Sequence, residues 1–420
     1  MNSIRLSIFV FICAALSGCT TTQNEAPKQL QTQTPEPAAP APAGPALRVS
    51  ADGSNAAEPA IAAVADGRIF VAWVEHRADK GADVFVREFD SSGSAKADSV
   101  RVNPEAGTAK AWRGDPPTIR VGGNGTIFVG WNAATEGSAG ASNLQLSVSS
   151  DGGRSFAPPV KVNDDSAPAS HGMHALAVGD DGRVYMAWLD ERYLAGRERS
   201  GHHNEMEGGE PNAELYFAVS SDGGETFSPN RRIVGDVCPC CKASITAPEK
   251  DGNMYIGWRQ VLPGEFRHIS IVASSDKGET FGQPVMVSDD RWKLSACPVS
   301  GPSLIQDGDA LAVTWYSGGE AGPHGLYWTH THDAGKTFSE PMLISEGNGG
   351  GSPVLLGDLV AWADSDKLFT AYISDHQTEN KTDLGDGSVP AGAAISNKLF
   401  LAFARRHGSD SSVWLSILGR

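Results

Sequence analysis

Four cysteines carry the most distinctive chemistry of this chain. Cys238, Cys240 and Cys241 lie in a Cys-Pro-Cys-Cys run, and Cys297 precedes another proline further along the sequence. Thiolates are preferred ligands of soft ions such as Cu(I), and mixed cysteine–histidine sets also suit Zn(II). Two other segments contain imidazole and thioether groups that could complete a Cys/His/Met centre. They supply His171, Met173, His174, His202, His203 and Met206.

The same cysteines also permit a purely structural role. Four is an even number, and in an oxidising compartment cysteines such as these form pairs. A bridge from Cys297 to one of the other three would join distant segments, and the remaining two would pair locally in a strained ring. Disulfides and a metal centre that takes Cu(I) ahead of Zn(II) therefore both remain open.

These segments belong to a repeated pattern of short apolar runs. Each run alternates apolar and aromatic residues, ends in Trp and follows a tight turn, which is typical of a strand entered through a hairpin. Repeats of this length indicate successive copies of one supersecondary unit. The runs are IFVAW at 69–73, IFVGW at 127–131, VYMAW at 184–188, MYIGW at 254–258 and LAVTW at 311–315.

A second pattern, Ser/Thr-x-Asp-x-Gly-x-Ser/Thr-Phe, follows each of the last four runs. We expect its carboxylate to accept hydrogen bonds from its own turn and its glycine to take a positive φ angle. We expect its phenylalanine to fill the core, so these aspartates are predicted to be structural. They are Asp151, Asp222, Asp276 and Asp333.

This pattern resembles the Asp box of the sialidase-like BNR-repeat family. The resemblance implies an all-β fold made of a single β-propeller. The family has six blades, whereas counting the candidate inner strands of this sequence gives seven. We predict one domain over 47–420, closed by pairing of the segment LRVS at 47–50 with the C-terminal segment at 412–418. The links between blades and the loops after second strands would meet around the axis, bringing the cysteines and histidines together.

The resemblance also implies a catalytic set to look for, namely three arginines around a substrate carboxylate, a tyrosine nucleophile and an aspartic acid/base. The family's first arginine lies in a motif that opens the first blade, where this sequence reads SNAAEPAIA without an arginine. We therefore expect no appreciable sialidase activity. A different catalytic set would have to come from Arg113, Asp115, Arg192, Arg259 and Tyr316.

Residues 1–18 contain one arginine followed by an apolar stretch of signal-peptide length, and their last three residues, Leu16-Ser17-Gly18, directly precede Cys19. This resembles a bacterial lipoprotein signal, which implies cleavage before Cys19 and acylation of that cysteine. The Pro/Ala-rich residues 19–46 are predicted to be a solvated tether. The resemblance places the protein in the cell envelope, at the outer membrane, with the membrane as a partner through its lipid anchor.

The charge balance narrows the range of partners. The chain has 34 Lys+Arg against 50 Asp+Glu, a formal charge of −16, and it has no basic run. A nucleic-acid partner is therefore not expected, because phosphate binding needs a basic face. The sequence leaves three hypotheses: a binding propeller with a soft-metal centre or a glycan or protein ligand at the axial face; an exo-sialidase-like glycoside hydrolase; and a disulfide-stapled scaffold.

Overall fold

The fold was analysed in a computed structural model. It describes residues 44–419, except 80, 111–113, 136–139, 196–211, 249–251, 295–297, 348–350, 352 and 375–376. In the described residues the chain is almost entirely β-strand, with one short 3-10 helix, η1 (Arg192–Leu194). No helix in this part of the chain is long and apolar enough to cross a membrane.

The strands fall into seven successive groups of four, which we call blades 1 to 7. Five blades are separate four-stranded sheets; blades 3 and 4 are joined through pairing of Val237 with Gln260. Blade 1 is β2 (Ala56–Ala63), β3 (Arg68–His76), β4 (Ala82–Asp90) and β5 (Val100–Arg101); blade 2 is β6 (Thr118–Val121), β7 (Ile127–Ala134), β8 (Ser142–Ser149) and β9 (Val160–Lys161); blade 3 is β10 (His171–Val178), β11 (Val184–Asp190), β12 (Ala213–Ser220) and β13 (Arg231–Val237). Blade 4 is β14 (Ser244–Ile245), β15 (Met254–Leu262), β16 (Phe266–Ser274) and β17 (Val285–Met286); blade 5 is β18 (Ser303–Asp307), β19 (Ala310–Ser317), β20 (Gly325–Thr331) and β21 (Met342–Glu346); blade 6 is β22 (Val354–Leu356), β23 (Leu359–Asp364), β24 (Lys367–Ser374) and β25 (Gln377–Asp386); blade 7 is β26 (Ser388–Ile395), β27 (Lys398–His407), β28 (Asp410–Gly419) and β1 (Leu47–Arg48).

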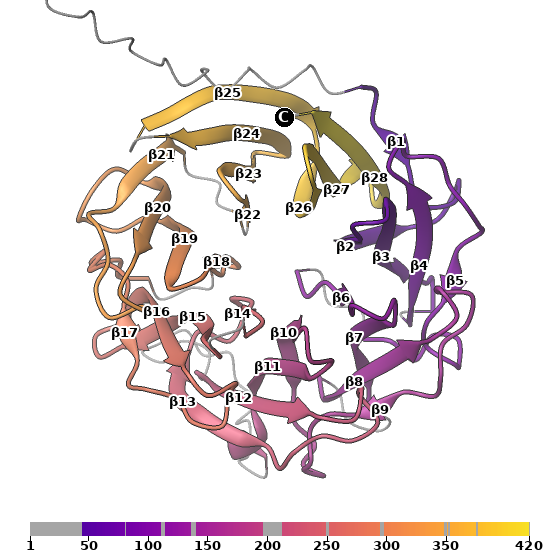
Figure 1. The fold of residues 1–420 in the computed structure, drawn as a ribbon, viewed down its shortest axis with the longest axis horizontal. Coiled ribbons are helices and arrows are strands. Elements are labelled where there is room, and N and C mark those ends of the chain that lie inside the picture. The colour runs from indigo at the N-terminus through magenta and orange to yellow at the C-terminus, as the bar shows by residue number, and fades with distance from the viewer. Residues whose placement is uncertain are drawn as a thin grey trace, which may run out of the picture. The chain divides into compact units, whose positions relative to one another are not determined.

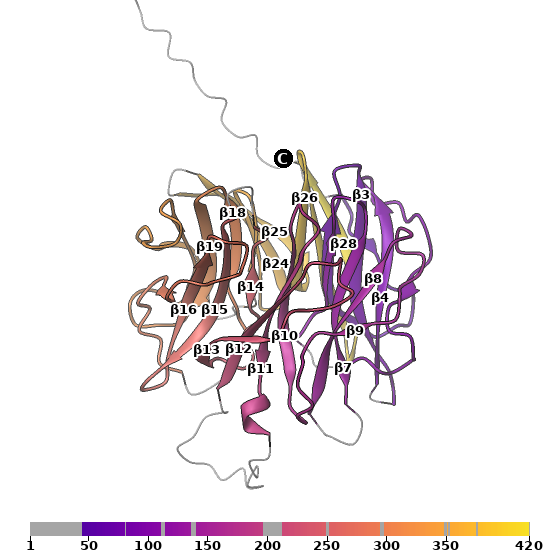
Figure 2. The same ribbon diagram turned by 60° about the horizontal axis from the view of Figure 1, so that its bottom comes forward.

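The blades follow one another around a ring, with the first strand of each nearest the centre (Figure 1). This is the predicted β-propeller, and its strand groups number seven, not the six of the family that it resembles. In an antiparallel blade, the link to the next blade and the turn between second and third strands lie at the same end. We call this the link end; η1, which joins β11 to β12, marks it at the bottom of Figure 2.

The ring is closed by the two ends of the folded chain. Leu47 pairs with Leu415 and Arg48 with Trp414, so that β1 becomes the outer strand of blade 7 beside β28. Val49 continues this contact, because its backbone N–H donates to the carbonyl of Val413 at 2.8 Å. The closure predicted from the isolated LRVS segment is therefore confirmed.

The five tryptophans of the repeated runs are all buried in the second strands of blades 1 to 5. A buried indole N–H needs an acceptor, and each one has a side-chain partner. The pairs are Trp73–Glu75, Trp131–Ser147, Trp188–Asp190, Trp258–Gln260 and Trp315–Asp290, at 2.7–3.1 Å.

The four Asp boxes form the turns between third and fourth strands, opposite the link end. In the box of blade 3, Asp222 accepts hydrogen bonds from the hydroxyls of Ser220 and Thr226 and from the backbone N–H of Thr226. These donors lower the pKa of Asp222 to about 2. The box glycine, Gly224, has a φ angle of 93°, and a Cβ there would lie 2.8 Å from Leu146 of blade 2. The boxes thus stiffen their own hairpins and pack blade against blade.

Candidate functional site

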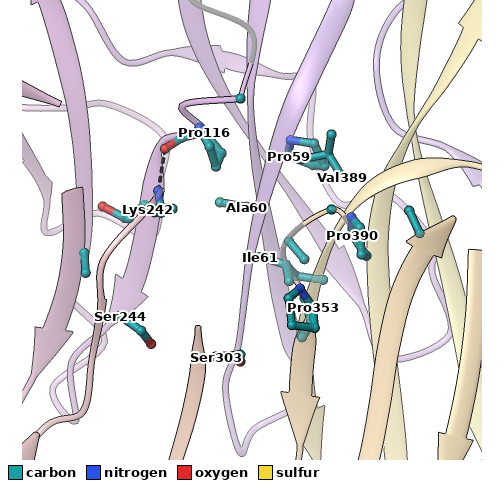
Figure 3. Close-up of a pocket in the computed structure, with 18 of the residues that line it drawn as sticks. Pro59, Ala60, Ile61, Pro116, Lys242, Ser244, Ser303, Pro353, Val389 and Pro390 are labelled. Carbon is teal, nitrogen blue, oxygen red and sulfur yellow. Dashed lines mark hydrogen bonds between the residues drawn. The ribbon is translucent and has the colours of Figure 1, made fainter. Parts of the chain in front are cut away.

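A cavity of about 580 Å³ opens at the centre of the ring, lined by the beginnings of all seven inner strands (Figure 3). Prolines recur around its wall. In five blades a proline stands directly before the point where the uninterrupted pairing of the inner strand with the second strand begins. These prolines are Pro59, Pro117, Pro302, Pro353 and Pro390. In blades 3 and 4 the same register position holds His174 and Ala243 instead. The rigid apolar wall is therefore interrupted on one side only.

Lys242 lies on this interrupted side. Its ammonium group donates a 2.8 Å hydrogen bond to the carbonyl of Pro116, across the gap between blades 4 and 2 (Figure 3). The pKa of Lys242 is lowered to about 8. Burial is the largest cause and the positive charge of Arg120 adds to it, while the Asp115 carboxylate acts in the opposite direction. A lysine in this state is charged at neutral pH but loses its proton far more readily than an exposed lysine.

Arg120 projects from β6 into the axial channel. It lines the cavity described above and also a second one of about 680 Å³, which is bordered by the far ends of β10, β14 and β18. The side chain is exposed to the channel. Its Nη1 atom donates a 2.9 Å hydrogen bond to the carbonyl of the preceding residue, Ile119. Arg120 therefore places a positive charge between the two halves of the channel.

Asp115 lies behind the cavity wall beside Lys242. One carboxylate oxygen accepts a 3.0 Å hydrogen bond from the backbone N–H of Met173, and the other accepts one from the Asn132 amide. Burial raises the pKa of Asp115, while Lys242 and the Met173 N–H act in the opposite direction. The carboxyl is thus held in place by two neighbouring blades, within electrostatic reach of the Lys242 ammonium.

Two buried polar side chains beside Asp115 lack partners in the described part of the chain. They are Thr118, through its hydroxyl, and His174, through both ring nitrogens. Both pack against Gly130, where a Cβ would lie 2.5 Å from the Thr118 hydroxyl and 3.0 Å from His174. Burial and the charge of Lys242 keep the pKa of His174 well below 6.5, so its ring is neutral. A buried polar atom without a partner costs free energy, which makes Thr118, a cavity-lining residue, a point for ligand binding.

The cysteine run follows β13 and forms a compact buried cluster. The sulfur atoms of Cys238, Cys240 and Cys241 all lie within 4.8 Å of one another. The sulfurs of Cys238 and Cys241 lie 3.4 Å apart and are not disulfide-bonded, whereas Cys240 is disulfide-bonded. This state differs from the alternative in which all four cysteines form disulfides, because a local pair within the run is not formed.

The thiols of Cys238 and Cys241 differ in acidity. A hydrogen bond from the Cys241 thiol, together with the positive charges of Arg259 and Arg267, lowers the pKa of Cys238 to about 7. Burial and the neighbouring Cys238 raise the pKa of Cys241 well above 9.0.

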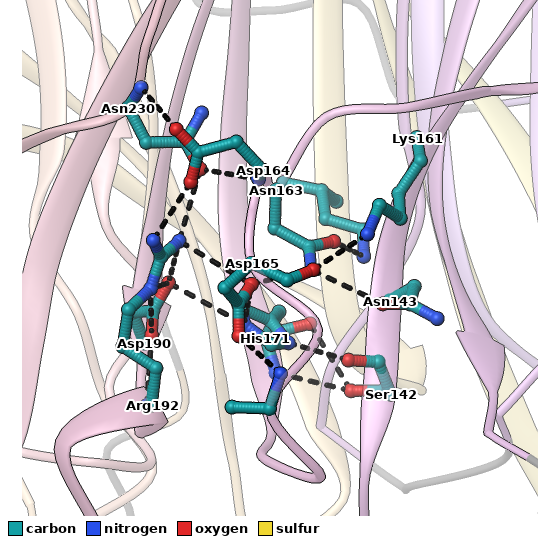
Figure 4. Close-up of polar contacts among 12 residues, drawn as sticks. Ser142, Asn143, Lys161, Asn163, Asp164, Asp165, His171, Asp190, Arg192 and Asn230 are labelled. Carbon is teal, nitrogen blue, oxygen red and sulfur yellow. Dashed lines mark hydrogen bonds and ion pairs between the residues drawn. The ribbon is translucent and has the colours of Figure 1, made fainter.

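The predicted histidine and methionine ligands do not all join this cluster. Met173 packs in the same apolar core as the three cysteines. His171 does not, because its ring is held by Asp165 at 3.0 Å, Asp190 at 3.5 Å and the carbonyl of Ser142 (Figure 4). His174 lies at the cavity wall, so neither histidine belongs to the group of sulfur ligands.

Arg192, Arg259 and Tyr316, named above as members of a conditional catalytic set, each have partners elsewhere in the ring. Arg192 binds Asp190 and Asp164 at 2.8 Å each, in the network that also holds His171 (Figure 4). The Arg259 side chain is fully buried and donates to the carbonyls of Ser300 and Tyr316 at 3.0 and 2.9 Å. The Tyr316 hydroxyl donates to the carbonyl of Gly347.

These groups brace the ring and do not converge on the cavity, whereas Asp115, from the same predicted set, does approach it. The remaining predicted positions lie outside the described residues. They are Cys19, Arg113, His202, His203, Met206 and Cys297.

Sequence reasoning missed three residues of the cavity, Thr118, Arg120 and Lys242. A signal existed for the first two, because the inner-strand segment 117–121 reads PTIRV and places polar side chains at alternate positions. Lys242 directly follows the cysteine run, and its neighbours in the sequence do not indicate that it lines a cavity.

Comparison with known proteins supports the fold. No protein-family model matches the chain, and no curated protein matches it in sequence. Among solved structures, a PL25 ulvan lyase bound to a GlcA–Rha3S saccharide is similar at a TM-score of 0.55, with 12% identity over 89% of this chain and 96% of the other. The polysaccharide lyase Uly1 matches at 0.53, with 12% identity over 86% and 89%.

A protein of unknown function from Dyadobacter fermentans matches at a TM-score of 0.52, with 14% identity over 89% of this chain and 97% of the other. Sialidases also match, at TM-scores of 0.49 and 0.48. At these identities the likeness to the structures with TM-scores above 0.5 concerns the fold alone.

Proposed function

We propose that the protein binds the acidic end group of a glycan in the axial cavity. The observation that carries this proposal is the position of two cations, Lys242 and Arg120, which both line the cavity and are close enough for the charge of Arg120 to lower the pKa of Lys242. The lining carboxylate, Asp366, is 3.8 Å from Arg406 and thus has a cation of its own. A carboxylate or sulfate placed between Lys242 and Arg120 would relieve their repulsion.

The shape and polarity of the cavity fit a saccharide end group. Its volume of about 580 Å³ is typical of a small-molecule site. Thr118, Ser244 and Ser303 are among its lining residues, and the buried hydroxyl of Thr118 has no partner in the described chain. The fold neighbour with a bound GlcA–Rha3S saccharide supports a glycan that carries both carboxylate and sulfate groups.

Binding is favoured over turnover by the state of the other charged groups. Of the two arginines that could have formed a carboxylate clamp, Arg192 is held in ion pairs, and Arg259 is fully buried and donates to two backbone carbonyls. The Tyr316 hydroxyl, the candidate nucleophile, is bound to a backbone carbonyl away from Lys242. We therefore expect no cleavage of a fluorogenic sialoside by the purified protein.

The test is calorimetric titration of the full chain with three oligosaccharides of equal length: uronate-containing, sulfated and neutral. We expect the acidic ligands to bind and the neutral one not to bind. Lys242→Met and Arg120→Met should each weaken binding by about tenfold or more, the value of one charge-assisted hydrogen bond.

Lys336→Met is the matched control, because Lys336 is an exposed lysine in an Asp-box turn at the opposite end of the ring. It should leave the affinity unchanged. Equal binding of neutral and acidic ligands, or wild-type affinity in both cavity variants, would contradict the proposal.

A second candidate function is soft-metal binding at the cysteine cluster. The observation that favours it is the closeness of the three buried sulfurs, all within 4.8 Å. Thiolates at this spacing suit Cu(I), with Zn(II) second. Because Cys240 is disulfide-bonded, a three-sulfur site requires that disulfide to be reduced first.

Metal analysis of protein purified anaerobically with and without a reductant tests this function. We expect about one Cu(I) per chain after reduction, lost in Cys238→Ser/Cys241→Ser. Absence of bound copper from the reduced, folded wild type would rule out this site.

A further inference from the structure

A second axial cavity, of about 680 Å³, continues the first along the inner strands of blades 3 to 5. At β14, Ser244 lines the first cavity, Ile245 lines both, and Thr246 lines the second. Arg120 of blade 2 also lines both. The inner-strand segments of blades 3 and 5 follow the same order, with 175–176 and 302–303 beside the first cavity and 177–178 and 304–306 beside the second. The two cavities are therefore consecutive sections of one axial channel, which adjoin at Ile245 and Arg120.

The second section leads from the cationic site toward the opposite end of the ring. Lys242, which lines the first section, precedes β14 by two residues. Asp180, which lines the second section, belongs to the turn between β10 and β11, and this turn lies opposite the link end. A saccharide that continues along β14 beyond its acidic group therefore enters the second section, whose volume is no smaller than that of the first.

The charge of the second section differs from that of the first. The described residues that line it include two charged ones, Arg120 at the junction and Asp180 beyond it. Asp180 is exposed. A carboxylate accepts hydrogen bonds from sugar hydroxyls, whereas it repels a carboxylate or sulfate on a ligand. The second section is thus unfavourable for a second acidic residue.

The rest of this lining suits an uncharged sugar ring. Val178 and Leu304 provide apolar surface for the C–H groups of the ring. Beside them, the Thr246 hydroxyl donates a 2.6 Å hydrogen bond to the side-chain carbonyl of Gln306, whose amide donates to the backbone carbonyl of Asn253 at 3.0 Å. These bonds fix polar groups of blades 4 and 5 at the wall before a ligand arrives, which lowers the entropy cost of binding.

We propose that the second section is a subsite for a neutral sugar, so that the channel selects a linear saccharide in which an uncharged residue adjoins the acidic one. This inference rests on the proposed function, because it takes the acidic residue at Lys242 and Arg120 as its starting point. It adds a requirement on the neighbouring residue of the ligand, which the two cations alone do not impose.

Calorimetric titration of the full chain tests this subsite, in about 0.15 M salt, where exposed charges more than about 8 Å apart are largely screened. The ligands are the methyl glycoside of glucuronate, disaccharides of glucuronate and a neutral hexose in both orders, and the glucuronate–glucuronate disaccharide. We expect the better mixed disaccharide to bind about tenfold more tightly than the monosaccharide, through added hydrogen bonds and apolar contact. The diuronate should bind no more tightly than the monosaccharide.

A charge reversal at the subsite sharpens the test. Asp180→Lys should make the diuronate the tighter-binding disaccharide, because its second carboxylate then meets a cation. Asp307→Lys is the matched control, since Asp307 is exposed, directly follows Gln306 and is not among the described lining residues of either section. The same change of net charge at that position should keep the preference for the mixed disaccharide.

Equal affinities for the mixed disaccharide and the monosaccharide, or a preference for the mixed disaccharide that survives Asp180→Lys, would overturn the subsite. If the monosaccharide still binds in that case and loses affinity in Lys242→Met, the proposed function stands without the subsite. If none of the acidic ligands binds, both are wrong, so the two failures are distinguishable.

Discussion

At the scale of single residues, the balance between burial and charge decides what the cavity can bind. Lys242 is flanked by a carboxyl, Asp115, and by a like charge, Arg120. Burial is the largest influence on both Lys242 and Asp115, and it favours the neutral form of each. The site is therefore poised close to a change of charge, which an anionic ligand would oppose by stabilising the ammonium form.

This gives a prediction for pH. Because the pKa of Lys242 lies at about 8, the ammonium group is present below that pH and is lost above it. Binding of an acidic saccharide should weaken by about tenfold as the pH rises through this range, with a midpoint displaced upward by the bound anion. An ordinary lysine would keep its charge to about pH 10.

Titration calorimetry at pH 7, 8, 9 and 10 measures this decline. Lys242→Arg is the matched control, since a guanidinium stays charged throughout and should remove the decline. A wild type whose affinity is constant over the range would show that Lys242 does not contact the ligand.

At the scale of elements, the Asp-box turns connect neighbouring blades. Gly223 and Gly224 are consecutive and both have positive φ angles, 75° and 93°. They differ in their surroundings: a Cβ on Gly223 meets nothing within 4 Å, whereas one on Gly224 meets Leu146 and Val148 of blade 2 at 2.8 and 3.2 Å. A substitution at either glycine pays the cost of a positive φ angle, but only one at Gly224 also disturbs packing between blades. Comparing the two positions therefore separates these two contributions to stability.

We predict that Gly224→Ala destabilises the domain by about 1–3 kcal/mol more than Gly223→Ala, because only the former overfills a packed interface. Denaturant unfolding of both variants measures the difference. Equal losses of stability would mean that the turn does not pack tightly on blade 2.

At the scale of the whole molecule, the ring depends on one seam between strands distant in sequence. The β28 strand pairs with β27 along its full length, from Lys398 with Gly419 to His407 with Asp410, and with β1 at two positions. Loss of β28 therefore leaves β27 and β1 without the strand that both pair with, and it exposes a long sheet edge.

We predict that deleting 412–420 abolishes cooperative unfolding of the native domain. Removing residues before 51 instead should lower the melting temperature by only a few degrees, because it removes the short β1 pairing and the buried side chain of Val49. Thermal unfolding followed by circular dichroism compares the two truncations. A deletion of 412–420 that melts like the intact chain would show that the ring does not need closing.

The sequence by itself determined much of this architecture. Alternating apolar runs and Asp boxes are local patterns, and local hydrogen bonds are enough to form each hairpin, so strands, turns and the structural role of Asp222 were predictable. The closing segment at 47–50 was also recognisable, because an unpaired strand motif without a blade must find an edge elsewhere.

Only the tertiary structure decided which polar groups meet. His171 and His174 are three residues apart, yet a backbone irregularity between Gly172 and Ala175 separates their environments, an ionic network for one and the cavity wall for the other. The partners of Arg192 and Arg259 lie in segments distant in the sequence, so the sequence alone did not show that these two cations are paired. Lys242 and Arg120 line the same cavity only because the fold turns blades 2 and 4 toward one axis. Their proximity could not be predicted from the sequence, since the free energy of a charge depends on every group around it and not only on its neighbours in the chain.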